Sequence, residues 1–110
     1  MNSEKIAEFN RKAAEHVWPE CSCELDEDSF VIVKDEFGRE VYSCFDPYHD
    51  ANDRNKVLEK MHIQTWWDYT CDMWGADKDR PQFDIWIIET GKTMEAAQIA
   101  CIASVLGVNQ

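Results

Sequence analysis

The hydrophobic pattern of this chain changes its period several times along its 110 residues, which restricts the fold to a mixture of helices and short strands. Apolar residues at spacings of three and four predict a first helix that is capped by Ser3 and ends before Pro19. The β-branched and aromatic runs 29–34 and 39–45, separated by a turn that contains Gly38, predict a β-hairpin. Apolar residues alternate onto both faces of this hairpin, which favours cover on both sides.

A second helix and a second hairpin follow along the chain. Asp50 or Asn52 is expected to cap the helix, because short polar side chains accept hydrogen bonds from the first helical amides. The Trp-rich run 64–74, the polar turn 75–80 and the run 81–89 then predict two further strands. Strict alternation along the Trp-rich run places neighbouring tryptophans on opposite faces of the sheet.

A third helix closes the chain. Thr93 is expected to cap it, and Gly107 to end it in the left-handed conformation. The predicted order of elements is α-β-β-α-β-β-α. We therefore predict an α+β fold: a single alpha-beta-alpha sandwich domain over residues 1–110, in which a four-stranded, mostly antiparallel sheet has helices on both faces.

Charge is the strongest global feature of the sequence. Eleven lysines and arginines stand against 22 aspartates and glutamates, which gives a formal net charge of −11. A field of this sign repels phosphate backbones, so direct binding to nucleic acid is disfavoured. It attracts basic surfaces instead, including those of proteins that handle nucleic acid. The simpler interpretation is that the charge serves solubility alone.

The sequence also predicts where the protein resides. Residues 1–18 carry charges throughout and lack the apolar core of a signal peptide, and no stretch approaches the roughly 20 apolar residues of a membrane span. The five cysteines form an odd set without an export signal, which predicts reduced thiols. We expect a cytoplasmic protein without a membrane partner, with Cys71 and Cys101 packed as small apolar groups.

Three segments carry a resemblance to a known family. These are the run FDPYHDANDRNKVLEKM at 45–61, the Trp-containing hairpin, and the ending ETGKTMEAAQIACIASVLG at 89–107. Together they resemble the alpha-beta-alpha sandwich family of small bacteriophage proteins. The positions that carry the resemblance are Phe45, Pro47, Asn52, Asp53, Trp66, Trp67, Trp74, Thr93, Ala97 and Ala100. It implies a phage origin, a three-layer fold and a location in the cytoplasm of the infected host, and it implies no catalytic residues.

Histidines and cysteines around the first hairpin are the candidates for a metal site. The cysteines Cys21, Cys23 and Cys44 and the histidine His49 stand close enough along the chain to meet. Structural zinc sites usually take their ligands from paired knuckles such as Cys-x-x-Cys, whereas here the two neighbouring cysteines are separated by one residue and no second knuckle exists. We therefore expect isolated thiols, no metal and no cofactor.

Two further motifs bear on catalysis. Gly91-Lys92-Thr93 matches the end of a phosphate-binding loop, but Trp86 occupies the place of the first glycine, and a helix cap at Thr93 explains the same letters. A catalytic Cys-His pair needs its two side chains within hydrogen-bond distance. Cys44 and His49 stand close enough in the sequence to be candidates for such a pair. A surface histidine beside a helix cap is the simpler interpretation. The sequence predicts that the protein is not an enzyme.

Aromatic and acidic residues form the candidate surface for a partner. Trp74 is the predicted aromatic anchor, because tryptophan is enriched among the residues that dominate binding energy at protein interfaces. The neighbouring carboxylates are expected to surround it. The alternative is that this tryptophan folds back over the sheet and closes the core. A second acidic cluster falls in the polar segment 20–28. The complete set of predicted partner-binding residues is Trp74, Asp72, Asp77, Asp79, Glu24, Asp26, Glu27 and Asp28.

These features give one leading functional hypothesis and two alternatives. The leading hypothesis is a non-enzymatic phage accessory protein that binds and inhibits a basic host protein of nucleic-acid handling or defence, as an anti-CRISPR protein does. The first alternative is a protein that sequesters a small molecule or nucleotide, with a base stacked on Trp67 or Trp86. The second is a phage domain without a specific activity. The sequence leaves the identity of the partner and the oligomeric state open.

Overall fold

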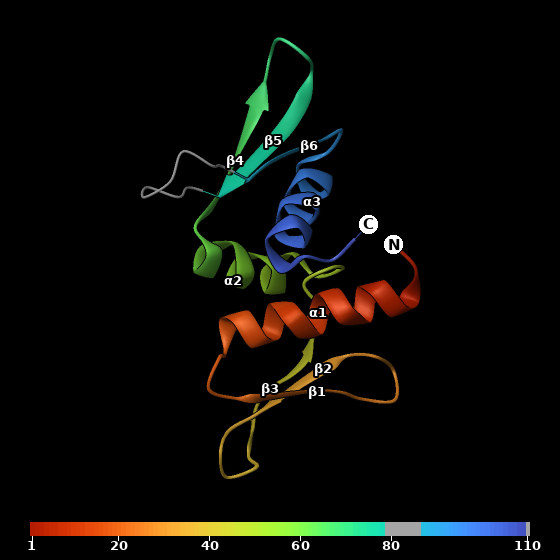
Figure 1. Cartoon of the computed structure of the whole chain (residues 1–110), viewed down its shortest axis with the longest axis vertical. Helices are drawn as coiled ribbons and strands as arrows, with labels where there is room; N and C mark the ends of the chain where they lie inside the picture. Colours follow the sequence, from red (N-terminus) through yellow and green to blue (C-terminus); the bar gives the residue numbers. More distant parts are fainter. Residues whose placement is uncertain (79–86, 110) are drawn as a thin grey trace. The chain divides into compact units, whose positions relative to one another are not determined.

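A computed structural model describes residues 1–78 and 87–109, with the side chains of 87 and 88 left aside. The chain divides into two compact units, Met1–Val57 and Leu58–Gln110. Figure 1 shows the helices and strands of both. The single domain over residues 1–110 stays a prediction, because the compactness of two units does not decide whether they fold together.

The first unit consists of one helix on one three-stranded sheet, followed by the start of a second helix. Helix α1 (Ser3–Val17) precedes strands β1 (Ser22–Leu25), β2 (Val31–Lys34) and β3 (Glu40–Phe45), which pair antiparallel in the order β1-β2-β3. Helix α1 packs on β1 and β2 (Figure 1). Helix α2 (Ala51–Met61) begins in this unit and ends in the next.

The second unit repeats the combination of one sheet and one helix. Strands β4 (Ile63–Asp68), β5 (Met73–Lys78) and β6 (Ile87–Gly91) form an antiparallel sheet in the order β4-β5-β6, and helix α3 (Met94–Leu106) packs on all three. The α+β class and three helices are confirmed. The single four-stranded sheet with helices on both faces is wrong, because the described residues form six strands in two three-stranded sheets.

Two local features explain why the strand count was wrong. The acidic segment 20–28, expected as a connection, contains β1, a short edge strand with exposed polar residues and little hydrophobic signal. The run 64–74, expected as one strand, is interrupted by a turn between β4 and β5, in which Asp72 adopts a left-handed conformation with φ of 51°. The expected turn 75–80 therefore begins inside β5, and the expected strand 81–89 lies outside the described residues except for its end in β6.

The core of the first unit lies between α1 and one face of its sheet. Phe9, Val31, Val33 and Phe45 are fully buried. The opposite strand face is more open: Ile32 is half-buried, and Phe30, which precedes β2, is 37% exposed, so this face is covered only in part. Antiparallel sheets commonly bury one face more completely than the other.

The core of the second unit is built from small side chains. Ala76 of β5 and Ala97 and Cys101 of α3 are fully buried, as predicted for Cys101, whereas Cys71 is exposed in the β4–β5 turn, contrary to the prediction. An added Cβ at Gly91 would lie 2.7 Å from the amide nitrogen of Ala97, so glycine is needed for this close approach. Small residues therefore set the spacing between α3 and the sheet.

Helix ends follow the sequence signals closely. The Thr93 hydroxyl accepts a hydrogen bond from Ala96 N at 3.0 Å, and Gly107 ends α3 with φ of 74°, as predicted. Asp50 accepts a hydrogen bond from Asp53 N at 3.0 Å at the start of α2, which confirms one of the two expected caps. Helix α1 is capped by Asn2 instead of Ser3, one residue earlier than predicted.

Candidate functional site

The two hairpin turns of the first unit share one backbone design. In the β1–β2 turn, Asp26 Oδ1 accepts hydrogen bonds from the backbone nitrogens of Asp28 and Phe30, each at 2.9 Å. In the β2–β3 turn, Asp35 Oδ1 accepts the equivalent two bonds, also at 2.9 Å. An aspartate that bonds its own turn in this way fixes the loop. Asp26, predicted to contact a partner, therefore organises the turn that carries its acidic neighbours.

Both turns close with a residue in the left-handed region. Ser29 has φ of 65° in the first turn, and Gly38 has φ of 77° at the matching place in the second. This is the expected geometry of a type I turn followed by a left-handed residue. The fixed backbone presents the second residue of each turn, Glu27 or Glu36, to solvent as an exposed carboxylate.

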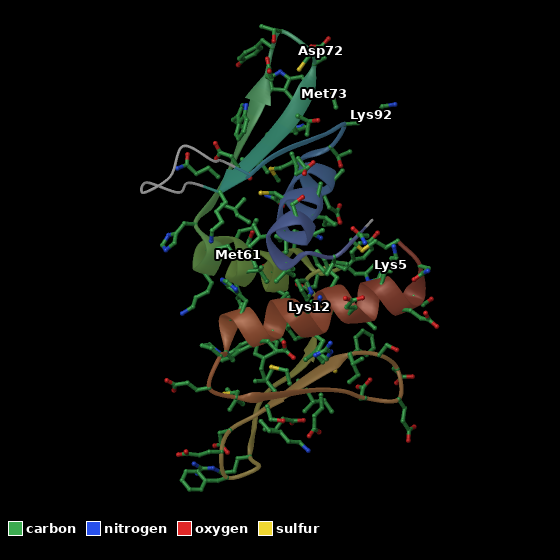
Figure 2. The ribbon with its side chains drawn as sticks, in the orientation of Figure 1. Lys5, Lys12, Met61, Asp72, Met73 and Lys92 are labelled. Atoms are coloured by element: carbon green, nitrogen blue, oxygen red, sulfur yellow. The ribbon has the colours of Figure 1, made fainter. Side chains whose placement is uncertain are left out.

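Exposed aromatic residues accompany the carboxylates at all three described hairpin turns. Phe30 flanks the β1–β2 turn, and Phe37 in the β2–β3 turn is 73% exposed. Tyr69 in the β4–β5 turn is 85% exposed and lies beside Asp68 and Asp72, and Figure 2 labels Asp72 where this turn meets β5. The sequence pattern did not mark Phe37 as a surface residue, and Tyr69, although it belongs to the aromatic band of the second predicted hairpin, is not among the predicted partner-binding residues.

The Asp68 side chain stabilises the β4–β5 turn in a similar way. Its Oδ1 accepts hydrogen bonds from Thr70 N at 2.9 Å and from Thr70 Oγ1 at 2.6 Å. These bonds favour the ionised carboxylate and hold the pKa of Asp68 below its usual value. The turn therefore keeps a fixed negative charge beside the exposed ring of Tyr69.

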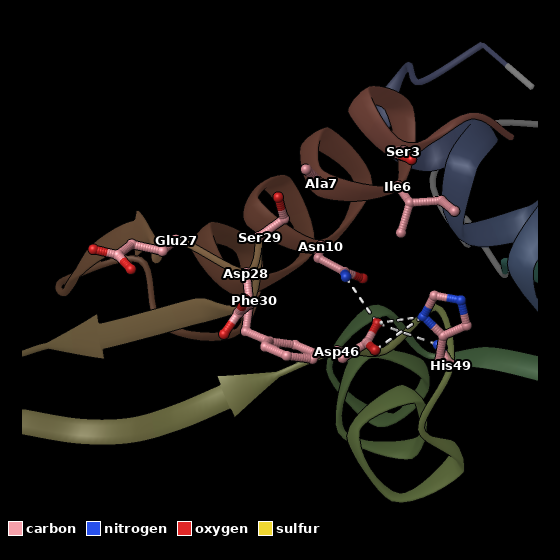
Figure 3. A pocket seen from close by; sticks show the side chains of 10 residues that line it. All are labelled: Ser3, Ile6, Ala7, Asn10, Glu27, Asp28, Ser29, Phe30, Asp46 and His49. Carbon is pink, nitrogen blue, oxygen red and sulfur yellow. Dashed lines mark hydrogen bonds and ion pairs between the residues drawn. The ribbon is translucent and has the colours of Figure 1, made fainter.

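The β1–β2 turn also forms one wall of a pocket in the first unit. The pocket has a volume of about 390 Å³ (Figure 3). It is lined by residues of α1, of the turn and of the segment before α2: Ser3, Ile6, Ala7, Asn10, Glu27, Asp28, Ser29, Phe30, Asp46 and His49. Its size falls within the range of about 300–1,000 Å³ that is typical of ligand pockets.

A hydrogen-bond network fixes the polar floor of this pocket (Figure 3). Asp46 is 9% exposed, and its Oδ1 accepts a bond from Asn10 Nδ2 at 2.8 Å. Its Oδ2 lies 2.9 Å from His49 Nδ1, and the His49 side chain is 63% exposed. Asn10 Oδ1 accepts a bond from Tyr48 N at 3.1 Å, which ties the segment to α1. Asp46 therefore orients the imidazole and leaves its second ring nitrogen for other contacts.

A second set of hydrogen bonds holds residues 46 and 47, which precede α2. Asp53 Oδ2 accepts a bond from Asp46 N at 2.9 Å, and its other oxygen accepts one from the Tyr42 hydroxyl. The bond to Asp53 raises the pKa of Tyr42 to about 12. Arg54 Nε donates to Pro47 O at 3.1 Å. The pocket floor is thus held to both helices of this unit.

This geometry bears on the catalytic and metal candidates. Asp46 and His49 do form a pair, but Cys44 is exposed with φ of 56°, and no hydrogen bond joins it to His49 among the described residues. Within residues 1–78 and 87–109, no three His, Cys, Asp or Glu side chains gather closely enough to hold a metal ion. The placement of Cys21 and Cys23 therefore provides no support for a zinc centre.

The predicted sites in the second unit are spread along one strand. Trp74 is half-buried in β5, opposite Trp67 of β4, with ring centroids 5.4 Å apart. Asp77 lies three residues further along β5, so alternation places it on the opposite face from Trp74. Asp72 lies in the turn, and Asp79 lies outside the described residues. Trp74 and Asp77 thus do not share one face of the sheet, and the role of the four residues in binding stays a prediction.

Comparisons with known proteins add no relative. No family model matches the chain, and neither a curated protein nor a solved structure matches it. Among the described residues, no helix has the length and apolar character needed to cross a membrane. The resemblance to the phage sandwich proteins therefore depends on the sequence segments alone.

Proposed function

We propose that this protein is a non-enzymatic binding protein that recognises the basic surface of a host protein of nucleic-acid handling or defence, within a bacterium infected by a phage. The observation that carries the proposal is the pairing of exposed aromatic rings with carboxylates at the hairpin turns, best developed at Tyr69. The formal net charge of −11 points the same way.

The chemistry of a nucleic-acid-binding channel explains why a partner with such a channel would bind these turns. Such channels present lysines and arginines to phosphates and stacking platforms to bases. Carboxylates on a fixed turn meet the cations, and an exposed ring stacks on a guanidinium or an aromatic side chain. The ring gives a desolvated anchor, whereas the charges mainly accelerate encounter.

The small-molecule alternative has less support where a nucleotide is concerned. Glu27, Asp28 and Asp46 line the pocket and repel phosphate groups, and its ten lining residues include no lysine or arginine. Trp67, one of the two expected stacking platforms, contacts Trp74 at its ring edge. A thermal-shift screen with nucleotides and cyclic dinucleotides decides between the two functions, because a ligand of the folded state raises the melting temperature.

The proposal is tested by capture from a bacterial lysate at about 50 mM and about 500 mM salt, since screening weakens exposed charge pairs. We expect nucleic-acid-binding proteins to be retained at low salt only, and to be released by added duplex DNA. The variant Tyr69→Ala and the double variant Glu27→Gln, Asp28→Asn should each retain less. A control with Glu4→Gln and Glu59→Gln removes the same charge from exposed helix positions and should retain as much as the unchanged protein.

Trp74→Ala separates the two predictions made for this residue. A partner anchor loses more than about 2 kcal/mol of binding free energy while the fold stays near its original stability. A buried tryptophan of the core loses roughly 3–5 kcal/mol of unfolding free energy on truncation to alanine. Capture of basic proteins that is equal for all variants and insensitive to DNA would refute recognition through the turns.

A further inference from the structure

We propose that the pocket of the first unit binds the guanidinium group of an arginine side chain that the basic partner presents. The source of the arginine rests on the proposed function, whereas the chemistry of the pocket does not. The pocket has a volume of about 390 Å³, which is ample for one side chain. It lies in residues 1–57 and needs nothing from the second unit.

The lining matches the two parts of an arginine side chain. One part of it is apolar and comes from Ile6, Ala7 and Phe30. An arginine buries its carbon stem against such a surface and keeps its charged end at polar groups. The polar part carries the Asp28 carboxylate and the buried Asp46, while Glu27 lies at the rim with its carboxylate directed away from Asp46 (Figure 3).

No lysine or arginine neutralises the carboxylates of the pocket, because its ten lining residues include neither. The Glu27 and Asp28 carboxylates find no hydrogen-bond or ion-pair partner among the described residues. Asp46 is bonded to the neutral amide of Asn10 and to the ring of His49, and its Oδ2 accepts one bond at most from these side chains. A carboxylate oxygen has two acceptor positions, so one stays open for a cationic donor.

Other ligand classes fit this lining less well. A metal ion needs converging ligands, and no three candidate ligands converge among the described residues. An anion would meet the carboxylates of Asp28 and Asp46, and one amide in the first turn of α1 and one in the first turn of α2 are already bonded to Asn2 and Asp50. A guanidinium is planar, weakly hydrated and able to bond several acceptors at once, which suits separate carboxylates better than the compact ammonium of lysine.

Blocked amino acids test the pocket without the partner. The probes are the Nα-acetyl methylamides of arginine, lysine and citrulline, of which citrulline has the shape of arginine without its charge. The readout is the NMR shift of the His49 ring and of the Asn10 side-chain amide. We expect saturable shifts with arginine, with a dissociation constant on the order of 1 mM or weaker. Lysine should bind several-fold more weakly, and citrulline about tenfold more weakly or not at all.

The two equivalent turns provide a matched pair of variants. Asp28→Asn should weaken arginine binding about threefold or more, and Glu27→Gln should weaken it less, because the Glu27 carboxylate is directed away from Asp46 and acts only through its charge. Glu36→Gln makes the same change at the matching position of the β2–β3 turn and should leave binding unchanged. Within residues 1–78 and 87–109, neither the Glu27 nor the Asp28 carboxylate has a hydrogen-bond or ion-pair partner, so these variants are expected to fold normally.

Each outcome has a defined meaning. Absence of shifts with arginine, or equal shifts with citrulline, overturns the pocket assignment and leaves the proposed function standing on its capture experiment. Equal binding of lysine overturns the preference for guanidinium. If arginine binds as expected but the Glu27→Gln, Asp28→Asn variant still captures basic proteins fully, the partner is not the source of the arginine, and that part of the proposal fails.

Discussion

Replacing Ser29 by glycine should stabilise the first unit. Ser29 closes the β1–β2 turn with φ of 65°, a conformation that costs an ordinary L-residue about 1–2 kcal/mol. Glycine removes this cost, but its greater conformational entropy stabilises the unfolded chain by about 0.5–1 kcal/mol. The net gain in unfolding free energy is therefore expected to be about 0.5–1 kcal/mol.

The second turn supplies the reverse experiment. Gly38 occupies the matching position with φ of 77°, and a Cβ added there meets no atom within 4 Å. The cost of Gly38→Ser is therefore conformational rather than steric, and we expect a loss of about 1 kcal/mol. The two substitutions exchange serine and glycine in opposite directions. The intrinsic difference between these residues in the unfolded chain therefore enters the two free-energy changes with opposite sign.

Urea unfolding followed by circular dichroism gives the free energy, and amide exchange of Val31 and Val33 localises the effect to the first unit. Both variants should keep the original slope with denaturant, since the exposed surface does not change. The reasoning is refuted if Ser29→Gly loses stability, because the serine would then contribute something other than its backbone angle.

Three other perturbations test separate features. Gly75→Ala should cost about 1–3 kcal/mol in urea unfolding, because the added Cβ would lie 2.4 Å from the ring of Trp66. Tyr42 has its pKa raised from 10.0 to about 12 by Asp53, so its contribution to stability is complete below about pH 10 and lost as the pH rises through about 12. In Asp53→Asn the tyrosinate absorbance should therefore appear at lower pH, and an unchanged titration would contradict the bond. Tyr69→Ala should change unfolding free energy by less than about 0.5 kcal/mol, because the side chain is 85% exposed, and a larger loss would place the ring in packing contacts.

Local signals in the sequence predicted the helix ends and failed for the edge of a sheet. Thr93 and Gly107 act through hydrogen bonds and backbone angles within a few residues, so their roles can be read from neighbouring letters. Strand β1 has four residues with mostly polar character and is a strand because β2 pairs with it over the whole length. That pairing is a tertiary effect, which alternation in such a short segment does not reveal.

The candidate site shows the same division between local and tertiary information. Asp46 and His49 stand three residues apart in the sequence, and the structure joins them at 2.9 Å. Asn10 is 36 residues away from Asp46, and nothing in the helical pattern marked it as a buried partner. The pocket depends on this distant contact, so its existence was not predictable from the letters around His49. The acidic residues were predicted as a cluster, and only the structure distinguishes the turn-forming Asp26 from the outward Glu27.

The small residues of the second unit have an evolutionary consequence. Gly75 leaves room for the ring of Trp66, and Gly91 leaves room for the start of α3, with no space for even one methyl group at either place. Large apolar residues exchange with one another at modest cost, whereas growth at a close contact displaces whole elements. Divergence among descendants of this chain should therefore be slowest at Gly75, Gly91 and Ala97 and faster at its larger apolar positions. A search pattern weighted on these small residues would recognise distant relatives better than one weighted on its tryptophans.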